Sequence, residues 1–227
     1  MSEWIPKTED GKKVLAGEIE SIDYFIDRGR RIMEPEIVDK LIPNLEAQLL
    51  LIGQSKGKFG GGKRKPFRVT QRKTEDGSKP KFSVMAVVGN RDGYVGIGFG
   101  TSSETMPARE KAIKNAKLNI IKIKRGCGSW QCGCKSPHSI PFKISGKCGS
   151  VRVEFLPAPR GTGLAVHSEC KKIFELAGVE DVWGKSFGQT RRRINLINAC
   201  FDALKSIKKT KSMDSFEKES GVVEGAK

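Results

Sequence analysis

Three of the six cysteines lie within eight residues of one another and are followed closely by a histidine. The spacing is C-x4-C-x-C, and three residues separate the last of these cysteines from the histidine; the four residues are Cys127, Cys132, Cys134 and His138. Three thiolates and one imidazole suit tetrahedral zinc. The sequence therefore predicts a zinc site. Buried reduced thiols are the alternative, because this is not the spacing of a standard zinc finger.

The fourth ligand has a second candidate. Cys148 lies across the next expected strand, whereas His138 is closer in sequence and has prolines around it that restrict the turn. We favour His138 and keep Cys148 as the alternative. A metal here would order a connector between two domains. The remaining cysteines, Cys170 and Cys200, lie on expected helices and are assigned to the core.

Two glycine-rich segments have spacings that occur in nucleotide-binding loops. Residues 57–63 have the spacing G-x-x-x-x-G-K, but Arg64 follows where such a loop needs a hydroxyl for magnesium. Residues 93–100 alternate glycine with larger residues, which is typical of a strand that another backbone approaches closely. Neither segment predicts a nucleotide site.

Catalytic residues are equally hard to find. The histidines are His138 and His167, and neither belongs to a nucleophile motif. Carboxylates such as Glu154 and Asp181 are typical of surface charges or local caps. We therefore expect that the protein is not an enzyme.

Basic side chains are concentrated in segments that cannot form a core. Residues 54–73 contain eight Lys or Arg, several glycines and no acid, so we expect a mobile loop that an anion would order. Lysines also line one face of an expected helix, where solubilising charge is the alternative. Together these charges predict contacts with an RNA backbone through Lys56, Lys58, Lys63, Arg64, Lys65, Arg68, Arg72, Lys73, Lys111, Lys114, Arg160, Arg191 and Arg192.

The charge of the whole chain supports a polyanionic partner. The 227 residues carry a net charge of +16; residues 1–50 contribute −4 and the rest +20. Nucleic acid and anionic membrane are the usual partners of such a surface, and a merely soluble basic protein is the alternative. No apolar run approaches the ~20 residues of a membrane span, and no secretory signal is visible. We expect a cytoplasmic protein with reduced cysteines.

Hydrophobic period and turn signals predict two folded units. The first is a meander of three strands followed by a helix, over residues 66–72, 82–88, 94–99 and 105–122. The second is an α/β unit with strands at residues 140–144, 150–156 and 182–183 and helices at residues 168–177 and 189–205.

The two ends of the chain differ from this middle part. Residues 1–44 are acidic and predict short helices, either as an extension that wraps a neighbour or as a small cap on the main domain. The segment after Lys208 is charged and predicted to be disordered. We expect an N-terminal extension (1–44), a first domain (45–125), a cysteine-rich connector (126–137), a second domain (138–208) and a charged tail (209–227).

Several strings in this order closely resemble the small-subunit ribosomal protein S5 family, most of all its archaeal and eukaryotic branch, whose eukaryotic member is called S2e. They are Gly93 to Gly100 with the following helix, Pro137 to Pro141, Gly149 to Arg152, and the PAPRGTG string at residues 157–163. The resemblance implies an α+β fold: a double-stranded-RNA-binding-like first domain and an α/β second domain with a left-handed βαβ crossover.

The resemblance also implies a function. The protein would be a structural constituent of the small ribosomal subunit and would bind ribosomal RNA near the decoding region and the path along which mRNA enters. It would lie beside the S4 and S8 family proteins and support assembly and translational accuracy. The hairpin loop at residues 70–81 matches the bacterial loop that reaches toward the head of the subunit. The alternative is an extraribosomal RNA-binding regulator or RNA chaperone that uses the same basic surface.

Overall fold

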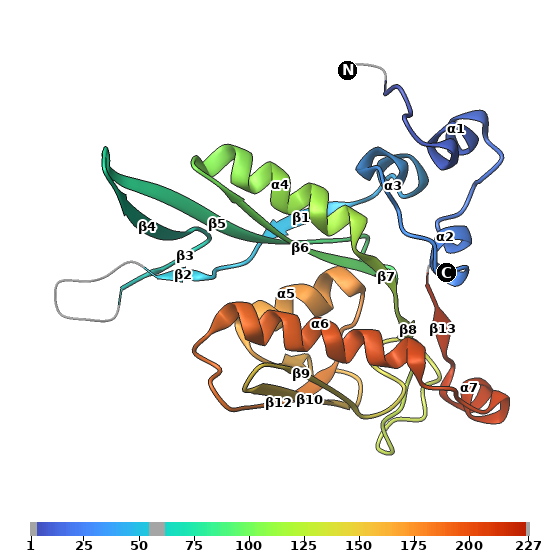
Figure 1. Cartoon of the computed structure of the whole chain (residues 1–227). Helices are drawn as coiled ribbons and strands as arrows, with labels where there is room; N and C mark the ends of the chain where they lie inside the picture. Colours follow the sequence, from blue (N-terminus) through green and yellow to red (C-terminus); the bar gives the residue numbers. More distant parts are fainter. Residues whose placement is uncertain (1–3, 55–61, 226–227) are drawn as a thin grey trace.

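Helices and strands alternate in four layers in the computed structural model, which describes residues 4–54 and 62–225. Helix α4 covers one face of a first sheet, helices α5 and α6 lie against its other face, and a second sheet packs beneath them (Figure 1). This arrangement confirms the expected α+β fold. None of the helices in the described part of the chain combines the length and apolarity needed to cross a membrane.

The first sheet is built around one long strand, β5. It runs in the order β1-β5-β6-β7, and β4 pairs with the outer part of β5, so the expected meander of β4, β5 and β6 is present. A small separate ladder joins β2 and β3 beside it. The strands are β1 Glu46–Leu49, β2 Gly53–Gln54, β3 Arg64–Lys65, β4 Arg68–Thr74, β5 Gly77–Gly89, β6 Tyr94–Ser102 and β7 Ile120–Lys122.

Helix α4 (Thr105–Leu118) lies unusually close to this sheet. Its alanines at 108, 112 and 116 are fully buried over three glycines of β6. A Cβ added to Gly98 would lie 2.2 Å from the carbonyl oxygen of Ala112, so only glycine fits there. The close backbone approach expected for residues 93–100 is therefore confirmed. The helix is shorter than predicted, because residues 120–122 form β7 and pair with the start of β6.

The second sheet has the order β11-β12-β10-β9. Strands β11 and β12 are parallel and joined through α5, which is the expected βαβ crossover, and the other pairs are antiparallel. Three elements have other bounds than predicted: β9 begins where its predicted strand ends, β12 extends into the predicted loop, and α6 both starts and ends four residues later than predicted. The elements are β9 Ile144–Cys148, β10 Val151–Pro157, β11 Leu164–Ala165, α5 Ser168–Ala177, β12 Val182–Phe187 and α6 Arg193–Lys209.

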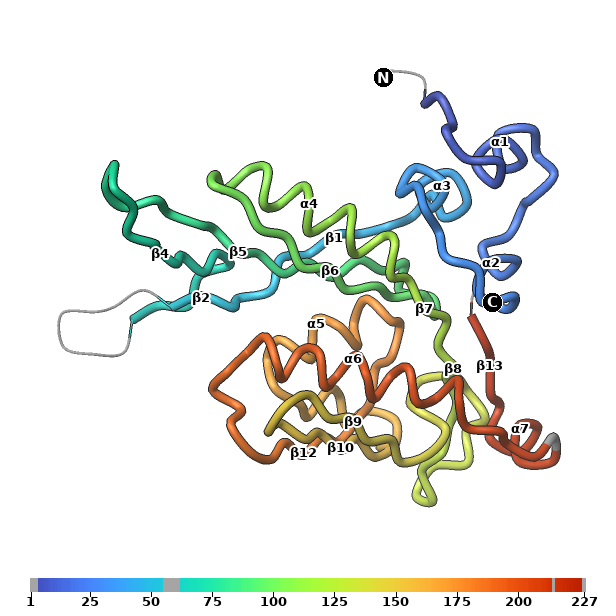
Figure 2. The backbone as a smooth tube through the Cα atoms, viewed as in Figure 1, coloured from blue at the N-terminus to red at the C-terminus, as the bar shows by residue number. Residues whose placement is uncertain are grey.

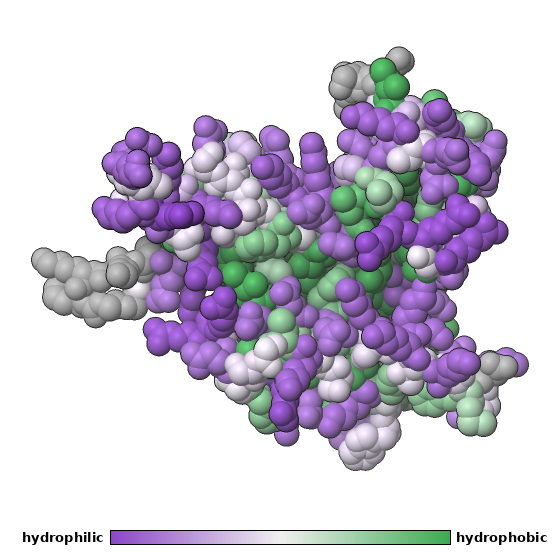
Figure 3. Space-filling view, viewed as in Figure 1, coloured by the Kyte–Doolittle hydropathy of each residue, from purple (hydrophilic) through white to green (hydrophobic). Residues whose placement is uncertain are grey.

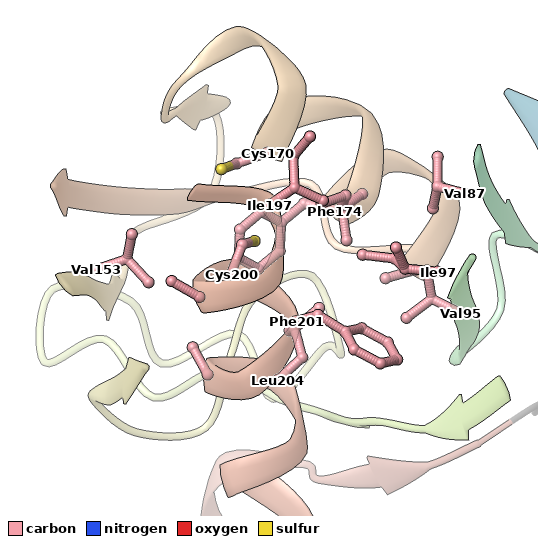
Figure 4. Packing of buried hydrophobic residues seen from close by; sticks show 14 of the residues in the cluster. Val87, Val95, Ile97, Val153, Cys170, Phe174, Ile197, Cys200, Phe201 and Leu204 are labelled. Atoms are coloured by element: carbon pink, nitrogen blue, oxygen red, sulfur yellow. The ribbon is translucent and has the colours of Figure 1, made fainter. Parts of the chain in front are cut away.

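One hydrophobic core joins the two sheets. Val95 and Ile97 of the first sheet face Phe174 of α5 and Phe201 of α6 (Figure 4). The same cluster continues into the second sheet through β10, and it includes Cys170 and Cys200, which are buried as predicted. The two units therefore hold each other in a fixed relative position.

The N-terminal residues form a small helical cap on the first sheet. Helices α1 (Glu9–Ala16), α2 (Asp23–Asp27) and α3 (Pro35–Leu41) share an apolar cluster with Tyr94 and Ile120. Acidic residues of the cap pair with basic residues beneath it: Asp39 with Lys117 at 2.6 Å and Asp23 with Lys122 at 3.0 Å. These contacts support the cap interpretation rather than a free extension.

The C-terminal segment is folded, so the prediction of disorder was wrong for its described residues. Helix α7 (Asp214–Ser220) is followed by β13 (Val223–Glu224), which pairs antiparallel with β8 (Lys124–Arg125), directly before the connector. The backbone amide of Cys127 also donates to the carbonyl oxygen of Ser220 at 2.8 Å. The tube in Figure 2 shows this segment returning past α2 alongside the connector.

Candidate nucleic-acid interface and metal centre

The outer part of the β4–β5 hairpin projects beyond the end of α4 (Figure 1). We call residues 68–81 the hairpin arm. It carries five basic side chains against two acidic ones, and hydrophilic side chains cover it in Figure 3. Arg72 and Lys73 are exposed, and Arg68 is partly exposed. Within the described residues none of these three has an ion-pair partner, so their charge is available to an anion.

The described residues 62–67 of the predicted basic loop lie at the base of this arm. Arg64 and Lys65 form β3, which pairs with β2, and Lys63 precedes it directly. Lys56 and Lys58 lie outside the described residues. Lys111 and Lys114 of α4 border a hollow of about 520 Å³ that also includes Phe99. The arm and this helix face thus lie on the same domain.

A second basic surface surrounds the loop at residues 157–163, here called the Arg160 loop. Arg160 is exposed and lines a pocket of about 680 Å³ together with Lys171 of α5 and Arg91 and Arg125 of the first unit. Arg91 pairs with Glu46 and Arg125 with Asp92. Among the described residues, neither Arg160 nor Lys171 has an ion-pair partner. This surface is separate from the hairpin arm.

The run of three arginines before α6 divides into two kinds. Arg191 and Arg192 are exposed in the turn before the helix. Arg193 lies 3.5 Å from the buried carboxylate of Glu169 and donates to Ser168 at 3.3 Å, so it is held within the protein. Only the first two are available for an external contact.

The predicted metal ligands come together in the connector. One ligand atom from each of Cys127, Cys132, Cys134 and His138 lies within 4.8 Å of the other three. The Sγ of Cys132 and the Nε2 of His138 are 3.9 Å apart. Zinc bonds of about 2.0–2.3 Å in a tetrahedron require ligand atoms slightly closer than this, so the cluster could hold a metal after a small contraction. Cys148 is not part of the cluster.

The thiols of this cluster differ in their ionisation. Burial raises the pKa of the Cys127 thiol to about 11. A hydrogen bond from Ser136, whose Oγ is 3.0 Å from the sulfur, lowers the pKa of the Cys134 thiol to about 6. Cys134 is therefore the member that most easily supplies a thiolate, and a bound cation would favour thiolate at the others.

The imidazole of His138 is held from behind by Asp181. Nδ1 of His138 lies 2.8 Å from Oδ2 of Asp181, and both side chains are buried. A carboxylate on Nδ1 leaves Nε2 free for a metal, which is the usual outer-shell arrangement of a histidine ligand. Asp181 is therefore not the surface charge that its sequence context suggested. Nothing in the sequence marked it, since its partner is 43 residues away.

Glu154 is the other carboxylate that the sequence suggested as surface charge. It pairs with Lys143 at 2.8 Å, and that pair lowers the pKa of the Glu154 carboxyl. This partly exposed pair lies on the second sheet and brings no nucleophile or second carboxylate into a catalytic geometry.

Family comparisons cover most of the folded chain. The model described as "Ribosomal protein S5, N-terminal domain" matches residues 66–124. The model described as "Ribosomal protein S5, C-terminal domain" matches residues 146–217. The two matches therefore fall on the first and second sheets with their helices.

Similar proteins extend the match to the whole chain. A protein of Nanoarchaeum equitans, "Small ribosomal subunit protein uS5", is 50% identical over 100% of this chain and 97% of its own length. Proteins of the same name from Methanocaldococcus jannaschii and Methanothermobacter thermautotrophicus are 47% and 45% identical, over 99% and 98% of this chain and 97% and 96% of theirs. Fold, motifs and relatives agree, and the chain belongs to the ribosomal protein S5 family.

Proposed function

We propose that this chain, as a structural constituent of the small ribosomal subunit, binds ribosomal RNA near the decoding region and the path along which mRNA enters. Two basic surfaces support the proposal: the hairpin arm and the Arg160 loop. The observation that carries it is the arm, which has five basic side chains and extends away from the core. An extended basic arm adds no core packing to the isolated protein, whereas it can reach an RNA backbone. The neighbouring proteins would belong to the S4 and S8 families.

The role follows from the way these surfaces are arranged. Two separate basic elements on one rigid core can fix the relative position of two RNA segments, which is how a structural protein supports assembly and accuracy. No group of residues in the described structure has the geometry of a catalytic centre, and we assign the protein no enzymatic activity. We expect it to act in the cytoplasm, bound to the ribosome.

We further propose that the cysteine–histidine cluster binds zinc. The donor set is three sulfurs and one imidazole nitrogen, and Asp181 already orients the imidazole. Zinc would close the connector between the two sheets. Its contribution would be structural, because a site with four protein ligands leaves no open position for substrate.

Crosslinking within purified small subunits tests the RNA contacts. Ultraviolet crosslinking followed by peptide and RNA identification should attach both the hairpin arm and the Arg160 loop to RNA segments around the decoding region and the mRNA path. Peptides of helix α2, which carries Asp23 and Asp27 and no basic residue, serve as the internal control and should remain uncrosslinked. A chain that leaves the subunit at moderate salt, or crosslinks that map to distant RNA, would contradict the proposal.

A further inference from the structure

Asp181 is a buried carboxylate that contacts two functional elements at once. Its Oδ2 lies 2.8 Å from Nδ1 of His138, and its Oδ1 accepts a hydrogen bond from the backbone amide of Gly163 at 2.7 Å. The side chains of His138 and Asp181 are each 4% exposed, so water competes little for these contacts. One carboxylate therefore joins the cysteine–histidine cluster to the end of the Arg160 loop.

The start of the same loop is linked to the backbone of Asp181 through Ser139. The backbone amide of Ala158 donates to Oγ of Ser139 at 3.3 Å, and this hydroxyl donates to the backbone carbonyl oxygen of Asp181 at 2.5 Å. Ser139 is fully buried and directly follows His138. Both ends of the loop that presents Arg160 are thus linked to Asp181, one through its carboxylate and the other through its backbone carbonyl and Ser139.

A metal in the cluster would act on the carboxylate of Asp181 through the imidazole ring of His138. When Nε2 binds a metal, the ring proton is on Nδ1, and Nδ1 donates to Asp181. The metal also withdraws electron density from the ring, which strengthens that hydrogen bond. A carboxylate fixed through Oδ2 keeps Oδ1 directed at the amide of Gly163.

We propose that Asp181 is a positioning residue that couples metal occupancy of the cluster to the conformation of the Arg160 loop. The inference rests on the proposed zinc site and on the proposed RNA contact of Arg160. Coupling between two binding events is reciprocal, so RNA held by the loop raises the affinity of the cluster for zinc by the factor that zinc raises the affinity for RNA. The metal then takes part in RNA recognition, besides closing the connector.

Hydrogen exchange of the full chain with and without zinc tests the coupling. Zinc should slow exchange of the Gly163 amide about tenfold. Exchange at Ala86, in the centre of β5, should stay the same. If zinc binds and Gly163 does not respond, the coupling is overturned while the zinc site stands. If no zinc binds, the zinc proposal and the coupling fail together, and the RNA contacts of the hairpin arm remain.

A matched pair of substitutions identifies Asp181 as the link. Asp181→Asn should weaken zinc binding by about 10–100-fold, as loss of an outer-shell carboxylate does, and should abolish the response of Gly163 to zinc. The control is Asp202→Asn, because Asp202 accepts the amide of Lys147 in the same domain and has no contact with the loop. Equal behaviour of the two variants would overturn the assignment. Should Asp181→Asn not fold, the comparison of wild-type protein with and without zinc decides alone.

Discussion

The hairpin arm and the Arg160 loop present the same kind of charge in opposite ways. The arm is held by strand pairing and by exposed hydrogen bonds from the hydroxyls of Thr70 and Thr74 to backbone carbonyl oxygens. Its one ion pair within the described residues, Lys79 with Asp76 at 3.1 Å, is exposed and worth at most about 1 kcal/mol. The Arg160 loop is tied at both ends to buried polar groups. The arm can therefore adapt to RNA, whereas the loop offers one preorganised arginine. Many weak contacts and one fixed contact should respond differently to substitution.

The strongest test of this contrast removes the proposed zinc site, which would fix the Arg160 loop through His138 and Asp181. Cys132→Ser should lower the zinc content from about one per chain to nearly none, because three ligands do not form a closed site. Elemental analysis of reduced, tag-free protein measures this. Cys148→Ser is the matched control, since that thiol lies outside the cluster. A protein that folds and binds RNA normally without metal would argue for buried thiols instead.

Removing the charge of the arm should give the next largest effect. The triple change of Arg68, Arg72 and Lys73 to Ala should weaken RNA binding. It should also reduce the slope of log affinity against log salt concentration by about 0.7–0.9 for each phosphate that the arm no longer neutralises. Thermal stability should hardly change, because the arm contributes no core. A salt titration of RNA affinity measures the change in binding. The control removes as many charges from the acidic cap, at Lys7, Lys12 and Lys13, and should leave the salt dependence unchanged.

A single substitution in the loop should do more than a single substitution in the arm. Arg160→Ala should lower RNA affinity about 10- to 150-fold, since a charge-assisted hydrogen bond from an arginine on a fixed backbone contributes about 1.5–3 kcal/mol. Arg72→Ala alone should cost much less, because neighbouring charges of the arm compensate. Footprinting should show a local change for the loop variant only. Identical footprints for the two variants would remove the distinction between the surfaces.

The smallest effect is expected on α4. Replacing Lys111 and Lys114 with Ala should change RNA affinity by only a few fold, since exposed lysines on a helix face often serve solubility. The slope of log affinity against log salt concentration separates the two roles. A decrease of about 0.7–0.9 for each lysine removed indicates phosphate contacts, and no decrease indicates a solvated face. Helix content should rise slightly or stay unchanged, because alanine is the best helix former.

The sequence predicted features that depend on local pattern. The glycine alternation of β6 correctly indicated a strand under a closely packed helix, because a missing Cβ is visible in the residues themselves. The end of α4 was misplaced because Ile120 and Ile123 continue the helical period of apolar residues. The edge of β6 pairs with residues 120–122 instead, and that competition depends on tertiary structure.

Features that depend on distant partners could not be predicted. Asp181 has an unremarkable sequence context, and its role comes from His138 and Gly163, which are in separate segments. The charged residues after Lys208 suggested disorder, yet Val222 lies against Gly126 and Val223 pairs with Arg125. For the cluster, the spacing favoured His138 over Cys148, and the fold brings His138, not Cys148, together with the three cysteines.

The pairing of β13 with β8 has a consequence for the order in which the protein can be made. Arg125 is synthesised after its partner Asp92 but long before another, since its guanidinium also donates to the carbonyl oxygen of Gly225, 100 residues further along the chain. During vectorial synthesis the N-terminal part of a chain folds first. The pairing of β8 with β13 can therefore form only after both sheets and α7 have left the translating ribosome. This pairing is then one of the last contacts that the chain can make during its synthesis.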